Sequence, residues 1–223
     1  DVSYAVGNLA RFAAAPGDAH VKAARRVLQY LYRTKSLGIT YYRESDQQRN
    51  VPMVFEQAKH PLDDGTNKTQ VFADSDYAAD ESRRSTMGGI IIQNGGPISW
   101  FSVLGKTVAL STCEAEINAA VMAAKDAIHI GRLIHDLGLN HDESPIQIAE
   151  DNSAAISQAA GGIRAVRKAK HYEVRLRFLQ ELVVQKAIEF VYCPTDIQLA
   201  DLLTKPLLPD RHTALTNALL FSA

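Results

Sequence analysis

Cysteine is scarce in this sequence. Among 223 residues there are only two, Cys113 and Cys193, which stand far apart and without the spacing of metal ligands. This scarcity argues against a disulfide framework and against a zinc site built on paired thiolates. It is typical of a reducing environment, so the sequence predicts an intracellular protein.

Long apolar runs and an excess of charge of one sign are also missing. No stretch approaches the length of a membrane span, and the first residues show no signal-peptide pattern, so no membrane contact is expected. The formal net charge is -1, which provides no overall attraction to nucleic acid. Any such binding must come from local basic patches. The chain begins at Asp1 without a methionine, which favours a piece cut from a longer protein.

Changes in periodicity divide the chain into three parts. Residues 2–35 show helical spacing in two segments separated at Pro16, and a strand is expected over residues 38–42. Residues 44–68 are rich in Gln, Asp, Asn, Lys and Pro and have no sustained period. We therefore expect a linker or surface loop over residues 44–68, between a small helical segment (1–43) and a larger domain (69–223).

The larger domain is predicted to belong to the α/β class. Its expected strands cover residues 69–74, 88–93, 98–103, 146–149 and 188–192. Its expected helices cover residues 111–137, 152–160, 168–185 and about 197–204. Asn94-Gly95 between two apolar runs predicts a hairpin, and Ser111-Thr112 can cap the long helix. This order of elements predicts a mixed sheet with helices on its faces.

Acidic residues stand at the ends of several of these elements. Asp74 ends the first strand of the domain and Asp151 follows the strand over 146–149. Glu116 lies near the start of the long helix, and Asp201 follows a short apolar run. Each acid alone has an ordinary explanation as a turn residue, a helix cap or a solvated side chain. Together they form the carboxylate set that a hard cation such as Mg²⁺ requires, and they indicate a metal-dependent nuclease.

Helix geometry separates Glu116 from its neighbour Glu114. The two residues lie about 200° apart around a helix, so they cannot both face the sheet. Small and apolar residues share the face of Glu116, whereas Lys125, His129 and Arg132 share the face of Glu114. Glu116 is therefore predicted to be the metal ligand and Glu114 to face solvent.

The choice between Asp74 and Asp76 as a metal ligand depends on their position in a strand. Alternation places Asp74 and Asp76 on one face of a strand, and Asp74 is preferred because it lies nearer the centre of the sheet. Glu150, beside Asp151, is expected to be solvated. Trp100 is expected in the core rather than as a platform for stacked bases.

Positive charge is densest between residues 164 and 177. For the later members of this run, a solvated helix face is an equally good explanation. Phosphate contact is favoured for Lys168, Lys170 and His171, which are close to Asp151 in sequence. Arg83 and Arg84, which precede a strand, are candidates for the same role.

Motifs over nearly the whole chain resemble one known family. Seven segments carry the resemblance: Asp74-Ser75-Asp76-Tyr77-Ala78, Arg83-Arg84-Ser85-Thr86-Met87-Gly88-Gly89, Gly96-Pro97-Ile98-Ser99-Trp100, Val108-Ala109-Leu110-Ser111-Thr112-Cys113-Glu114-Ala115-Glu116, Glu150-Asp151-Asn152-Ser153-Ala154, Lys170-His171, and the run from Pro194 to Pro206 that contains Gln198-Leu199-Ala200-Asp201. They resemble the ribonuclease H domain of copia-type LTR retrotransposon Pol polyproteins. Residues 1–43 resemble the end of the reverse transcriptase of the same polyproteins, whereas the segment 44–68 matches nothing that we can place.

The resemblance implies a ribonuclease H-like mixed five-stranded sheet flanked by helices and preceded by a small helical segment. It implies an endoribonuclease that cleaves the RNA strand of RNA/DNA hybrids during reverse transcription, in the cytoplasm or a virus-like particle. Its partners would be the hybrid and the reverse transcriptase portion of the same polyprotein. Two Mg²⁺ ions, which Mn²⁺ can replace, would be held by Asp74, Glu116, Asp151 and Asp201, with Asp74 bridging both. The segment from Cys193 to Asp196 lacks the histidine that many ribonucleases H carry before the last acid, which puts histidine-assisted product release in doubt.

Two other functions are compatible with these residues. In the first, the chain is a non-catalytic connection-type module that supports the polymerase and binds hybrid without cutting it. In the second, it is a nuclease of the same fold that cleaves DNA. Intact acids argue against the first, and cleavage of a labelled hybrid separates all three.

Overall fold

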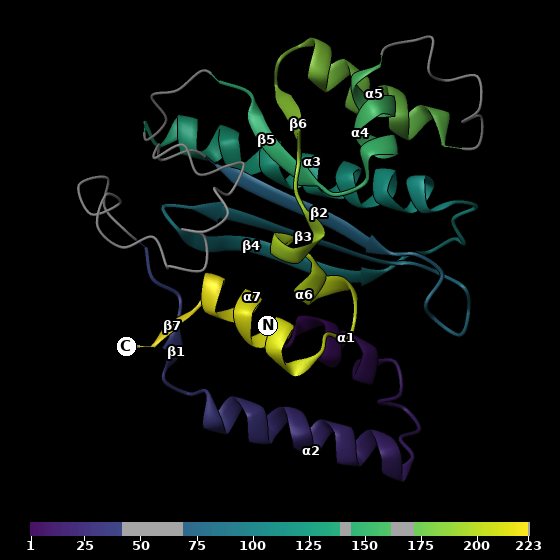
Figure 1. Ribbon diagram of the computed structural model, residues 1–223, viewed down its shortest axis with the longest axis vertical. Coiled ribbons are helices and arrows are strands. Elements are labelled where there is room, and N and C mark those ends of the chain that lie inside the picture. The colour runs from purple at the N-terminus through teal and green to yellow at the C-terminus, as the bar shows by residue number, and fades with distance from the viewer. Residues whose placement is uncertain (42–68, 139–143, 162–171, 223) are drawn as a thin grey trace.

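The computed structural model describes residues 1–41, 69–138, 144–161 and 172–222 (Figure 1). Its centre is a five-stranded sheet with the order β4-β3-β2-β5-β6. The strands are β2 (Gln70–Asp76), β3 (Thr86–Gln93), β4 (Gly96–Leu104), β5 (Ile146–Glu150) and β6 (Ile188–Tyr192). Strands β2, β3 and β4 pair antiparallel, whereas β5 is parallel to both β2 and β6. The predicted mixed five-stranded sheet is confirmed.

Helices cover both faces of the sheet (Figure 1). On one side lie α3 (Thr112–Asp136), α4 (Ser153–Ala160) and α5 (Glu173–Val184), and on the other lie α6 (Asp201–Thr204) and α7 (Pro209–Leu219). Side chains alternate along β2, so that Val71 and Ala73 join the core under α3 while Phe72 joins the core under α6 and α7. Burial on both faces explains why β2 is a nearly continuous apolar run up to its acids.

Local sequence signals explain the main turn and the longest helix. Asn94 and Gly95 connect β3 to β4 with positive φ angles of 53° and 76°, the conformation that a tight hairpin requires. Ser111 caps α3, because its side chain accepts a hydrogen bond from the backbone N–H of Glu114 at 3.1 Å. Both features agree with the predictions.

The N-terminal segment lies against the C-terminal one. Helix α1 (Ser3–Ala10) packs on β4 and α6, and helix α2 (Asp18–Arg33) follows it. Of the strand expected over residues 38–42, only Gly38 lies in a strand, β1 (Leu37–Gly38), which pairs with β7 (Phe221–Ser222), and residues 39–41 have no strand structure. Residue 42 and the expected linker 44–68 lie outside the described residues.

Two C-terminal elements, α7 and β7, are absent from the predicted set. The last predicted helix is a 3-10 turn, η3 (Thr195–Ile197), followed by the short helix α6. Helix α7 then contacts the chain start, because His212 Nε2 lies 3.1 Å from the carbonyl oxygen of Asp1.

Both cysteines are buried free thiols. None of the helices in the described ranges has the length and apolar character needed to cross a membrane.

Candidate metal centre

Three carboxylates meet at one edge of the sheet. Asp74 lies in β2, Asp151 directly follows β5, and Glu116 lies near the start of α3. Because β2 and β5 are parallel neighbours, their carboxyl ends fall at the same edge. One oxygen atom from each of these three side chains lies within 4.8 Å of the others. The structure thus brings together three of the four predicted ligands.

Within β2, Asp74 rather than Asp76 belongs to this cluster. Both residues lie on one face of the strand, as alternation predicts, but Asp74 is 1% exposed and Asp76 is half-buried. The Thr204 hydroxyl donates a short hydrogen bond to Oδ2 of Asp74 and holds this carboxylate in place. The structure thus places Asp74, the preferred residue, in the group of three carboxylates and leaves Asp76 outside it.

The predicted exposure of Glu114 is wrong. Glu114 and Glu116 are each only 6% exposed, although residues two positions apart on a helix differ by about 200° in direction. The loop before α3 covers Glu114, because the backbone N–H of Leu110 donates to Oε2 of Glu114 at 2.7 Å. Glu114 thus anchors the loop that precedes α3, while Glu116 Oε2 is buried and has no hydrogen-bond partner.

Asp151 is not the cap of α4, which was its ordinary explanation. Asn152 caps this helix, since its side chain accepts from the backbone N–H groups of Ala154 and Ala155 at 3.0 and 3.1 Å. Asp151 Oδ2 instead accepts a hydrogen bond of 2.9 Å from the hydroxyl of Thr195 in η3. The carboxylate is partly exposed, unlike the buried side chains of Asp74 and Glu116.

Asp201 lies beside Asp74 but outside the group of three. It is fully buried at the start of α6, where Lys205 Nζ is 2.7 Å from Oδ1 and Arg211 binds Oδ2. Lys205 Nζ is also 3.4 Å from Oδ2 of Asp74. The fourth predicted ligand is thus connected to Asp74 through a lysine.

Gly88 permits α6 to approach the sheet this closely. Gly88 is the partner of Asp74 in the β2–β3 register. A Cβ atom at Gly88 would lie 2.6 Å from Thr204 Cγ2 and 2.8 Å from Leu203 Cβ, which are distances that real Cβ atoms do not adopt. Only glycine therefore lets Thr204 and Asp201 reach Asp74.

Gln198 anchors the segment before Asp201, a role that the sequence analysis missed. Its side chain is fully buried, and Nε2 donates to the carbonyl oxygens of Ala73 at 3.1 Å and Ala149 at 3.4 Å. It therefore joins the segment that precedes α6 to the C-terminal halves of strands β2 and β5. A polar residue within the apolar run before Asp201 was the available signal. For Arg211, which lies ten residues after Asp201, there was no such signal.

Glu150 is a further buried acid, which corrects the expectation that it is solvated. It is 0% exposed because it shares a face of β5 with Ile148, and α3 covers that face. Its Oε1 accepts from the backbone N–H of Asn152 at 3.1 Å, and its Oε2 has no hydrogen-bond partner. Alternation along the strand was the signal that could have identified it.

Burial raises the pKa of three carboxyl groups in and beside the cluster. Desolvation raises the pKa of Glu116 to about 11, and the negative charges of Glu150, Asp74 and Asp151 contribute to this rise. Burial also raises the pKa of Asp74 and raises that of Glu150 well above its ordinary value. A cation among these oxygens would oppose these shifts, because it stabilises the charged form of each carboxylate.

Metal binding should therefore release protons. Because the folded pKa of Glu116 exceeds its ordinary value of 4.5, metal-free Glu116 is protonated at pH 7, and its stabilising contribution is lost as pH rises from 4.5 towards 11. A bound ion requires the ionised form, so we expect release of about one proton for each chain that binds Mg²⁺ at pH 7. Calorimetric titrations in two buffers of different ionisation enthalpy measure this number. Glu116→Gln should remove the release, and a binding heat that is the same in both buffers would contradict the prediction.

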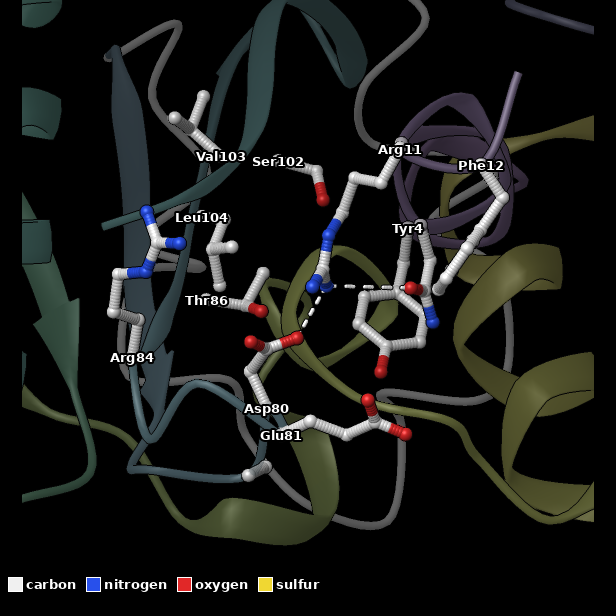
Figure 2. A pocket seen from close by; sticks show the side chains of 13 residues that line it. Tyr4, Arg11, Phe12, Asp80, Glu81, Arg84, Thr86, Ser102, Val103 and Leu104 are labelled. Atoms are coloured by element: carbon white, nitrogen blue, oxygen red, sulfur yellow. Dashed lines mark hydrogen bonds and ion pairs between the residues drawn. The ribbon is translucent and has the colours of Figure 1, made fainter. Parts of the chain in front are cut away.

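The predicted nucleic-acid contacts are only partly described. Lys168, Lys170 and His171 lie outside the described residues. Arg83 is exposed, and Arg84 lines a groove of about 530 Å³ between α1 and strands β3 and β4 (Figure 2). An ion pair between Arg11 and Asp80 crosses this groove, and none of the four candidate ligands lines it. Arg84 is therefore separate from the candidate metal centre.

Trp100 is not a core residue, contrary to expectation. It lies on β4 opposite Ile90, on the face that α6 and α7 cover farther along the sheet. Because β4 is an edge strand, half of the residue's surface (50%) remains exposed.

Comparison with known proteins relates the chain to polyproteins of mobile elements. It is 31% identical to the retrovirus-related Pol polyprotein from transposon TNT 1-94 of Nicotiana tabacum, over 92% of this chain and 14% of that protein. It is 30% identical to the corresponding polyprotein from transposon RE1 of Arabidopsis thaliana, over 93% of this chain and 13% of that protein. A third relative, the secreted RxLR effector protein 161 of Plasmopara viticola, is 37% identical over 57% of this chain and 77% of that protein. No family model matches the chain.

Two solved structures to which part of the chain is similar are an RNase H1 and an RNase H domain. An RNase H1 isolated from compost matches 62% of this chain and 94% of its own, with 17% identity and a TM-score of 0.49. The N-terminal RNase H domain of Rv2228c from Mycobacterium tuberculosis matches 68% of this chain and 99% of its own, with 15% identity and a TM-score of 0.44. The sequence homologues of this chain are thus retrovirus-related Pol polyproteins of copia-type plant transposons, and the chain spans about one seventh of the length of the two polyproteins named above.

Proposed function

We propose that this chain contains a metal-dependent endoribonuclease that cleaves the RNA strand of RNA/DNA hybrids during reverse transcription of a retrotransposon. The observation that supports the proposal is the group of Asp74, Glu116 and Asp151, whose oxygens lie within 4.8 Å of one another, with Asp201 beside it. Such a set of carboxylates at the edge of a sheet can hold the divalent cations that phosphodiester hydrolysis uses. The partners would be the hybrid and the reverse transcriptase part of the polyprotein, in the cytoplasm or a virus-like particle.

The donor set fits Mg²⁺. All the ligands are carboxylate oxygens, which Mg²⁺ and Mn²⁺ prefer, and Glu116 Oε2 is buried without any other partner. Asp74, Glu116 and Asp151 would hold one ion, and Asp74 with Asp201 would hold a second. When bound, such ions make water a stronger nucleophile and stabilise charge on the attacking and leaving oxygens.

The chain's own residues orient these ligands and the substrate. Thr204 fixes Asp74 and Thr195 fixes Asp151, so that both carboxylates are positioned before any ion arrives. The cations Arg83, Arg84, Lys168, Lys170 and His171 are proposed to contact phosphates of the hybrid. The 2′-hydroxyl, which distinguishes RNA from DNA, would lie near the Glu116 end of the centre.

A connection-type module is the second candidate. Helix α1, from the segment that resembles the end of the reverse transcriptase, packs on β4 and α6 of the sheet domain. Such packing is what a module that supports the polymerase requires. This module would bind the hybrid without cleaving it.

The proposed function predicts cleavage of hybrid RNA by the purified chain with Mg²⁺. A substrate labelled separately on its RNA and DNA strands should lose intact RNA, while its DNA strand and a DNA duplex of the same sequence stay intact. EDTA should stop the reaction because the carboxylates then have no cation to share. Tight binding without cleavage would favour the connection-type module. Equal cutting of the DNA duplex would favour a DNA nuclease of the same fold.

A further inference from the structure

A lysine lies between two carboxylates of the candidate metal centre. Lys205 Nζ is 2.7 Å from Asp201 Oδ1 and 3.4 Å from Asp74 Oδ2. The side chains of Asp201 and Asp74 are 0% and 2% exposed, and that of Lys205 is 28% exposed. An ammonium group therefore lies where a cation shared by these two acids would be expected.

The part of the centre around Glu116 and Asp151 differs in its charge partners. Among the residues that the structure describes, Lys205 is the cation that pairs with Asp74, and no ion pair is found for Glu116 or Asp151. The buried Oε2 of Glu116 also has no hydrogen-bond partner. The centre thus consists of a part around Glu116 without a cation among the described residues and a part around Asp201 that already holds a positive charge.

We propose that Lys205 is an internal counter-ion that occupies the Asp74–Asp201 side of the centre until a second metal ion displaces it. The inference rests on the proposed function and extends it. The two ion positions then fill unequally. The first ion binds at Asp74, Glu116 and Asp151, whereas the second binds weakly because the ammonium group must leave first.

The surroundings of Lys205 allow such a displacement. The residue follows the last turn of α6 with an extended backbone (φ -143°, ψ 157°), and its partly exposed side chain borders solvent. Asp201 does not depend on Lys205 for its position, because Arg211 binds the other carboxylate oxygen, Oδ2. Thr204 likewise continues to hold Asp74. Both ligands therefore keep their places when the lysine turns away.

Counting bound Mn²⁺ tests the proposal without any nucleic acid or catalysis. Free Mn²⁺ is measured by electron paramagnetic resonance during titration of the wild-type chain, Lys205→Met and Lys205→Arg. Lys106→Met is the matched control, because Lys106 is an exposed lysine outside the centre. Melting curves in EDTA accompany each titration. Should Lys205→Met fail to fold, Lys205→Gln replaces it, since a glutamine keeps a hydrogen-bond donor between the two acids.

The wild type is expected to bind one Mn²⁺ strongly and a second weakly. Lys205→Met should strengthen binding of the second ion by at least about tenfold, because a like charge within a few ångströms of the ion has been removed. The same variant should melt lower in EDTA. Lys205→Arg and Lys106→Met should retain the wild-type pattern.

The contrary outcomes separate this inference from the proposed function. Unchanged or weaker binding of the second ion in Lys205→Met, with strong binding of the first, would overturn the inference alone. It would show that Lys205 is only a structural ion pair. If the wild type bound no Mn²⁺, or if Glu116→Gln left its binding unchanged, the proposed function would fail together with the inference.

Discussion

Glu116→Gln is expected to lower cleavage of hybrid RNA by more than about 100-fold, whereas Glu114→Gln should stay within about threefold of wild type. Glu116 shares the group of three carboxylates, and its Oε2 has no other partner. Glutamine has nearly the same shape but no charge, so the variant loses a ligand without creating a cavity. The cleavage rate of a labelled hybrid at saturating Mg²⁺ measures the effect.

Glu114 is a matched control because it has the same chemistry, the same 6% exposure and a position on the same helix. It accepts a hydrogen bond from Leu110 that a glutamine side-chain oxygen can also accept. We therefore expect Glu114→Gln to cost only about 0.5–1.5 kcal/mol of stability, measured by chemical denaturation. Equal losses of activity in the two folded variants would show that Glu116 has no special place in the centre.

Asp74→Asn is expected to raise the melting temperature of the metal-free protein. Burial is the main cause of the raised pKa of Asp74, and the charge of Asp201 adds to it, while Lys205 opposes it. Two carboxylates 4 Å apart repel by about 4 kcal/mol at an effective dielectric constant of 20, of which Lys205 and Arg211 offset a part. A net gain of about 1–2 kcal/mol is expected, which corresponds to roughly 2–8 °C for a chain of this size.

The same substitution should remove most of the stabilisation by Mg²⁺. Ion binding at 100 times the dissociation constant stabilises a protein by about 2.7 kcal/mol, and the variant has lost the ligand that is central to the site. Thermal melts in EDTA and in Mg²⁺ measure both effects. Below the ordinary pKa of 3.8 the advantage of the variant in EDTA should vanish, because wild-type Asp74 is then protonated in the folded and unfolded states alike.

Asp76→Asn is the control for these melts, since Asp76 lies on the same face of β2 but is half-buried and outside the group of three. It should change the melting temperature and the response to Mg²⁺ much less. A lower melting temperature of Asp74→Asn in EDTA, with the full gain from Mg²⁺, would mean that Asp74 is not part of a clustered metal site.

Elements with a strong local period could be predicted from the residues alone. The hairpin at Asn94-Gly95, the cap at Ser111 and the alternation along β2 depend on neighbouring residues, and all three are found in the structure. Helix α7 was missed, and it is packed through contacts with distant parts of the chain, such as that between His212 and Asp1.

In the candidate site, too, some features depend on neighbouring residues and others on contacts between distant parts of the chain. The sequence by itself determined that Asp74, Glu116 and Asp151 stand near the ends of their elements, because strand and helix periods are local properties, although β2 continues two residues beyond Asp74, the predicted strand end. Only the tertiary structure decided that Glu114 and Glu150 are buried, and that Lys205 and Arg211 bind Asp201. Burial and ion pairing depend on which distant segment covers a side chain: the loop before α3 covers Glu114, and α3 itself covers Glu150. The close approach of α6 over Gly88 brings Asp201 and its two cations to the sheet, and no pattern along the chain records that approach.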